Sequence, residues 1–325
     1  MRRLFSTGPA VALAVVACVS AAPPADSAGG AGAEPVQSTP SPAGAPTHPV
    51  TGKALEDRPE DRASLVARLD GAQPVRGPRG EDVGDRDGRA TALVKIRDNR
   101  ITFAFSWEGV STPTLAHIHR GAPGTNGEPA VGLFTSPMPE GVHSAAGQTT
   151  LIDADLAEEL RTSPREFYVS LQNAEFPGGA LRAQLEPLAE RVNPLSFVKG
   201  GQLRGHASGG QAVPIGDVRA VGDPDGHAVT FLHPGRASLG YSMAWVNLAP
   251  PSSAHVHRGA LGRNGPAAVP LFTSPVPRNV FALSGEVQAK DAGLLRGLSS
   301  GASGFYANVR TQEFPDGAVR GQLFR

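Results

Sequence analysis

Hydrophobic and polar residues alternate with a period of two in many short segments after residue 60. The segment RITFAFSWEG, residues 100–109, has Ile, Phe, Phe and Trp at every second position. LGYSMAW, residues 239–245, has Leu, Tyr, Met and Trp in the same arrangement. Successive side chains of a strand point to opposite faces, so both segments predict strands with one core face and one small or polar face.

The other segments extend this pattern. EFYVSLQN (166–173) and GAVRGQL (317–323) also alternate, and Gly- and Asn-rich turns such as GAPGTNG (121–127) separate the strands. A short helix is predicted at 153–160, where Asp153 can cap the first turn, with a counterpart at 290–298. The chain is therefore expected to be all-β, with a Greek-key-like sandwich or barrel as its unit.

The chain contains two copies of this unit. An offset of 138 residues separates Trp107 from Trp245, and the same offset links Tyr168 to Tyr306. It also links GDRDG at 84–88 to GDPDG. A constant offset of this length indicates two folded domains in tandem, which we place at 61–190 and 195–325.

The amino terminus predicts an export signal. Arg2 and Arg3 precede an apolar run at 11–17, and VVAC ends at Cys18, the only cysteine of the sequence. The pattern is similar to a bacterial lipobox, so residues 1–17 are expected to be a lipoprotein signal peptide and Cys18 the lipidated residue. The alternative is an ordinary signal peptide that is cleaved later and discards Cys18.

Residues 18–60 are dominated by Ala, Pro, Gly and Ser and have no apolar period. Such a segment cannot bury enough surface to offset its ordering entropy, so we expect a disordered tether. The protein is then expected outside the cell, at the outer face of the membrane or cell envelope, with the membrane as a partner through the lipid. A secreted protein is the alternative.

Charge and motifs exclude several functions. Lys and Arg number 30, as do Asp and Glu, so the surplus of positive charge typical of nucleic-acid binding is absent. No Ser or Cys lies in a recognisable catalytic triad context, and no catalytic residue is predicted. Asp85 and Asp87 resemble half of a calcium loop, but no Glu follows at the required spacing, so a turn is expected.

The candidate chemistry lies in two His-x-His segments. His117 and His119 precede GAPGTNG, and His255 and His257 precede GALGRNG. Residues i and i+2 of a strand face one side, so each pair presents two imidazoles together. Imidazole is a good ligand for copper or zinc, and the arrangement is similar to the copper strand of copper–zinc superoxide dismutase. Alternatively, each histidine donates to a carbonyl of the following loop.

The motifs AHIHRGAPGTNG and FYVSLQNAEFPGGALRAQL, repeated in the second copy, resemble the CHRD (chordin-type) domain. The resemblance covers nearly all of 61–325 and implies an immunoglobulin-like or dismutase-like β-sandwich without established enzymatic activity. Gln172 and Arg310 occupy the place where the family often has a further histidine, which weakens a metal site. We therefore expect a non-enzymatic binding or structural protein, with an unknown protein or surface ligand and no cofactor. The alternative is a copper or zinc protein, either a carrier or a dismutase relative.

Overall fold

The computed structural model describes residues 62–77, 80, 82–150, 152–191, 193–214, 221–289 and 291–325. The predicted signal peptide (1–17), Cys18 and the tether (18–60) lie outside these ranges. Neither α-helix among the described residues is both long and apolar enough to cross a membrane.

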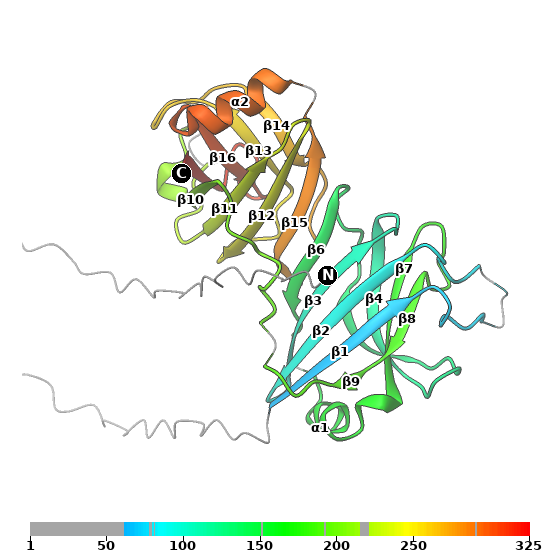
Figure 1. Cartoon of the computed structure of the whole chain (residues 1–325). Helices are drawn as coiled ribbons and strands as arrows, with labels where there is room; N and C mark the ends of the chain where they lie inside the picture. The colour runs from blue at the N-terminus through cyan, green and yellow to red at the C-terminus, as the bar shows by residue number, and fades with distance from the viewer. Residues whose placement is uncertain are drawn as a thin grey trace, which may run out of the picture. The chain divides into compact units, whose positions relative to one another are not determined.

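The first domain is built almost entirely of antiparallel strands (Figure 1). Its elements are β1 (Arg62–Asp70), β2 (Arg89–Arg97), β3 (Arg100–Glu108), β4 (Pro113–Arg120), β5 (Pro129–Phe134), β6 (Val142–Gln148), α1 (Ala154–Thr162), η2 (Pro164–Glu166), β7 (Phe167–Asn173), β8 (Leu181–Gln184) and β9 (Glu186–Pro187).

These strands form two sheets of a β-sandwich. One has the order β6-β3-β2-β1 and the other β5-β4-β7-β8. The sheets join at a single β1–β8 pair, Asp70 with Arg182, and β9 also pairs with β1. The chain crosses between the sheets after β3, β5 and β6, which produces the Greek-key-like connection expected from the sequence.

The second domain repeats this order with β15-β12-β11-β10 and β14-β13-β16-β17. Its elements are β10 (Leu203–Ser208), η3 (Gly209–Gln211), β11 (His227–Pro234), β12 (Ser238–Val246), β13 (Ser253–Arg258), β14 (Ala267–Phe272), β15 (Val280–Gln288), α2 (Ala292–Ser300), η5 (Ala302–Gly304), β16 (Phe305–Arg310) and β17 (Val319–Phe324). The all-β class and the tandem arrangement are confirmed.

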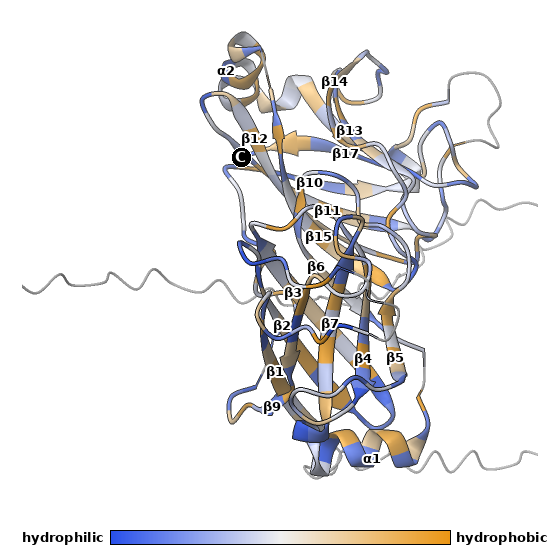
Figure 2. Ribbon diagram, turned by 90° about the vertical axis from the view of Figure 1, so that its right-hand side faces the viewer, coloured by the Kyte–Doolittle hydropathy of each residue, from blue (hydrophilic) through white to orange (hydrophobic). Residues whose placement is uncertain are grey.

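The strand alternation produces the core. Phe103, Phe105 and Trp107 of β3 are all buried, and Figure 2 shows hydrophobic and hydrophilic positions alternating along the strands. Strand β7 differs from the expected pattern, because both of its faces are buried from Phe167 to Leu171. The face away from the core is covered by a loop and a buried arginine, described below.

Two local predictions are also confirmed. The carboxylate of Asp153 caps α1 by accepting from the backbone N–H groups of Asp155 and Leu156, and Asp291 caps α2 in the same way. In the GDRDG turn, the carboxylate of Asp85 accepts from the backbone N–H of Gly88 at 3.1 Å. Asp85 therefore closes a turn, and Asp223 does the same with Gly226 in the second copy.

Strands β6 and β15 also pair with each other in antiparallel fashion. Ala145 is paired with Leu283, its own equivalent at the offset of 138, and Ser144 is paired with Ser284. The flanking bonds repeat this relation: Gln148 N–H donates to Asn279 and Glu286 N–H donates to Gly141. The two copies thus meet through equivalent strands, the pattern of a two-fold symmetric contact.

Candidate functional site

One histidine of each pair is bonded to its own glycine loop. His119 lies in β4, and its Nδ1 is 3.0 Å from the carbonyl oxygen of Gly127. His257 in β13 makes the same contact with Gly265, also at 3.0 Å. A carbonyl only accepts, so Nδ1 holds the hydrogen in both residues and Nε2 is left with its lone pair.

An aromatic ring and a guanidinium stack on that histidine. The ring of Tyr168 from β7 lies 4.8 Å from the ring of His119 and almost parallel to it, with an angle of 8°. The guanidinium of Arg182 from β8 lies 3.6 Å from the centre of the Tyr168 ring, within the range of a cation–π contact. The second copy has the same three-layer stack, formed by His257, Tyr306 and Arg320.

The arginine at the end of this stack also donates hydrogen bonds to the glycine loop. Arg182 is only 3% exposed and donates to the carbonyls of Ala122 and Thr125 and to the side-chain oxygen of Asn126. Burial lowers the pKa of the Arg182 guanidinium. Arg320 is 2% exposed and makes the equivalent three contacts in the second copy. A buried guanidinium is stable only when its N–H groups are paired, and here the loop supplies the acceptors.

A glutamine completes the support of the loop. The side-chain amide of Gln184 donates to the carbonyl of Gly121 at 2.7 Å, at the start of the loop. At the end of the loop, the N–H of Gly127 donates to the hydroxyl of Tyr168 at 3.2 Å. Gln322 and Tyr306 repeat both contacts. Each loop is therefore held by hydrogen bonds at both of its ends, and the buried arginine binds the residues between them.

The sequence did not identify these arginines as site residues. Arg182 and Arg320 lie at polar positions of alternating strands, where a charged side chain usually faces solvent. The available signal was their repetition at the offset of 138 together with Gln184 and Gln322.

The other histidine of each pair has a different environment. His117 and His255 are half-buried, and their rings lie 5.7 and 5.9 Å from the rings of His119 and His257. Neither donates to its glycine loop among the described residues. The structure therefore brings the two histidines of each pair together, as predicted from the strand spacing, but gives a loop contact to only one.

Several nitrogen atoms of these pairs are buried without a hydrogen-bond partner. They are Nε2 of His119, Nε2 of His257 and Nδ1 of His255. Burial is the main cause that lowers the pKa of all four imidazoles, which favours the neutral form that binds metals. A histidine that donates through one nitrogen to a carbonyl and offers the other is the usual form of a metal ligand.

The number of ligands is nevertheless small. Among the described residues, no group of three or more His, Cys, Asp or Glu side chains is placed to hold a metal. In the second copy, the charge of Arg310 lowers the pKa of both His255 and His257, and its buried Nε also has no partner. The donor type fits copper or zinc, but the protein supplies half of a four-coordinate shell.

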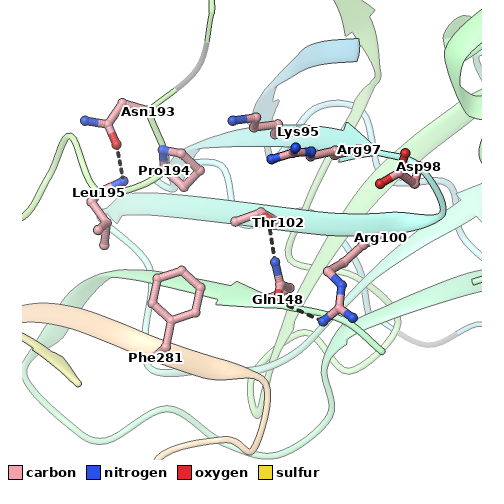
Figure 3. Close-up of a pocket in the computed structure, with 10 residues that line it drawn as sticks. All are labelled: Lys95, Arg97, Asp98, Arg100, Thr102, Gln148, Asn193, Pro194, Leu195 and Phe281. Atoms are coloured by element: carbon pink, nitrogen blue, oxygen red, sulfur yellow. Dashed lines mark hydrogen bonds between the residues drawn. The ribbon is translucent and has the colours of Figure 1, made fainter. Parts of the chain in front are cut away.

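A separate groove with a volume of about 530 Å³ lies elsewhere on the chain (Figure 3). Arg100 lines it and donates to the side chain of Gln148, which donates in turn to Thr102. None of the four paired histidines lines this groove, so it is distinct from the histidine site.

Comparison with known protein families identifies both domains. A family model of the CHRD domain matches residues 65–185 and again 203–323. No curated protein and no solved structure matched the chain.

Proposed function

Because this chain belongs to the CHRD domain family and has two such domains, we propose that it is a membrane-anchored, extracytoplasmic, non-enzymatic protein that binds or presents a ligand. The lipid on Cys18 is the anchor, and the segment 18–60 holds the domains away from the membrane. The ligand is a protein or another component of the cell surface.

The proposal is supported by the hydrogen bonds that the polar side chains of the site form with the glycine loop. His119, Tyr168 and Arg182 each form at least one hydrogen bond with the backbone of one loop, as do their equivalents in the second copy. A catalytic group has to reach a substrate, whereas these groups hold a surface loop in one conformation. A loop that is ordered before binding loses less entropy when it binds, which favours recognition.

The second loop displays an apolar side chain on this rigid support. Leu261 is 70% exposed, and Arg263 beside it is also exposed. The equivalent of Leu261 in the first copy is Pro123, which is exposed as well. Exposed apolar and arginine side chains on a fixed loop are typical of contact residues in protein interfaces.

The proposal is tested by replacing Leu261 with a photoreactive amino acid and irradiating intact cells. The control places the same amino acid at Arg236, which is exposed in the turn between β11 and β12. We expect a discrete cross-linked product from position 261 alone, and a weaker one when Arg320→Met removes the support of the loop. Equal products at both positions, or none at 261 in protein shown to be on the surface, would overturn the proposal.

A second candidate function is copper or zinc binding, as a carrier or as a relative of the dismutases. The partnerless Nε2 atoms of His119 and His257 favour it, because a buried acceptor without a partner is costly. Elemental analysis of the purified protein after dialysis against a chelator tests this function. Stoichiometric bound metal would support this function. If the protein retains no metal even after it has been loaded with copper or zinc, the function is contradicted.

A further inference from the structure

We propose that the two histidine pairs are not equivalent. His117 and His119 of the first domain bind one Cu²⁺ ion per chain, whereas Arg310 prevents His255 and His257 of the second domain from binding one. This inference rests on the metal-binding candidate above and adds which pair binds, which ion it binds and what excludes it from the other pair.

In the first pair, Nε2 of His119 is oriented and free to act as a metal ligand. The contact of Nδ1 with Gly127 fixes the His119 ring and directs its lone pair to Nε2, which is buried and partnerless. The ring of His117 lies 5.7 Å away, centre to centre. Two imidazoles that share one ion at about 2 Å from each nitrogen have centres about 6 Å apart when the angle at the ion is wide. The separation thus suits a shared ion.

The charges around the first pair oppose a cation less strongly than those around the second pair. Glu128 directly follows the loop, and its carboxylate offsets part of the effect of burial and of the Arg182 charge, which lower the pKa of His119. The residue equivalent to Arg310 is Gln172, which has no charge. The opposing charge of Arg182 has its counterpart in Arg320 and does not distinguish the two copies.

The charges around the second pair are less favourable to a cation. Arg310 of β16 is paired with Ser253, two residues before His255 on β13, and its positive charge acts on both His255 and His257. Pro266 replaces Glu128, so the nearby negative charge is lost. Nδ1 of His255 and Nε2 of His257 are both buried without a partner, so the supply of nitrogen ligands does not exclude an ion from this pair, and the charge of Arg310 does. A cation at this pair would face a guanidinium without a neighbouring carboxylate to offset it.

Copper is favoured by the small number of ligands. Cu²⁺ binds nitrogen ligands more tightly than the other divalent ions of the first transition row, so it tolerates a site with two imidazoles and water better than zinc does. We therefore expect the first pair to select Cu²⁺ when both ions are offered.

The test measures Cu²⁺ bound per chain by equilibrium dialysis, using the full chain with Cys18→Ser so that its only thiol is absent. Electron paramagnetic resonance then reports nitrogen atoms bound to the copper. We expect one ion per chain with nitrogen ligands, and the same protein should bind Zn²⁺ at least tenfold more weakly. His117→Ala and His255→Ala are matched variants, because neither side chain donates to its loop among the described residues. The first should remove the ion and the second should not.

Exchanging the charge gives the decisive comparison. Arg310→Gln should raise the stoichiometry from one to two, and Gln172→Arg should lower it to zero. If Gln172→Arg fails to fold, Arg310→Gln still decides the question. Two ions on the unmodified pairs, or loss of the ion in His255→Ala alone, would refute the inequivalence and leave the metal function standing. No bound copper in any variant would refute both.

Discussion

Replacing Arg320 by methionine should destabilise the second domain strongly, because this buried side chain holds the glycine loop. The guanidinium donates to Ala260 at 2.9 Å, to Arg263 at 2.9 Å and to the side chain of Asn264 at 3.2 Å. It also lies 3.7 Å from the centre of the Tyr306 ring. Methionine retains much of the apolar volume but none of these hydrogen bonds.

The cost follows from what the loop loses. A hydrogen bond to a charged group contributes about 1.5–3 kcal/mol, and the cation–π contact contributes about 1 kcal/mol. The exposed loop regains part of this loss by turning its carbonyls to water. The net decrease in the free energy of unfolding is therefore expected to be about 3–5 kcal/mol.

Urea denaturation followed by circular dichroism measures this decrease, and hydrogen exchange at the backbone N–H of Gly265 reports the loop directly. Arg204→Met is the control, since Arg204 is exposed and its guanidinium lies 4.9 Å from the centre of the Phe324 ring, in a cation–π contact outside the loop support. The control should cost less than about 1 kcal/mol. If Arg320→Met changes the stability by no more than the control does, the guanidinium does not hold the loop.

Three further predictions concern the anchor, the core and pH. Cys18→Ser should move the protein from the membrane fraction to the medium, and a wild-type protein found only in the medium would contradict the anchor. Trp107→Ala and Trp245→Ala should each lower the free energy of unfolding by about 3–5 kcal/mol in a urea melt, whereas an effect below 1 kcal/mol would show that the ring does not fill the core. Burial lowers the pKa of His257 in the folded state, so the unfolded state binds more protons at acid pH. Stability should be complete above the unfolded pKa of about 6.5 and fall as pH decreases through the lower folded value, and His257→Gln should flatten this dependence in thermal melts from pH 8 to 5.

The strands and helices could be predicted because their signals are local. The alternation around Phe103 depends only on neighbouring residues, and Asp153 caps a helix that begins one residue later. The repeat was equally accessible, since equivalent residues keep one offset through both domains.

The different roles of the two histidines in a pair could not be predicted. The spacing of His117 and His119 places both on one face of β4, but only the fold decides which of them lies beneath the loop. The burial of Arg182 also depends on distant residues, because its acceptors lie about 60 positions earlier in the sequence. Contacts between segments so far apart leave no periodic signal in either one.

One histidine of each pair supports its own glycine loop through Nδ1. Nuclear magnetic resonance of the ¹⁵N-labelled imidazoles tests it most directly, because it shows which ring nitrogen is bonded to hydrogen. We predict that His119 and His257 are neutral at pH 7.5, with hydrogen on Nδ1 and none on Nε2. Hydrogen on Nε2 in both residues would contradict the account, because Nδ1 could then not donate to the loop carbonyl.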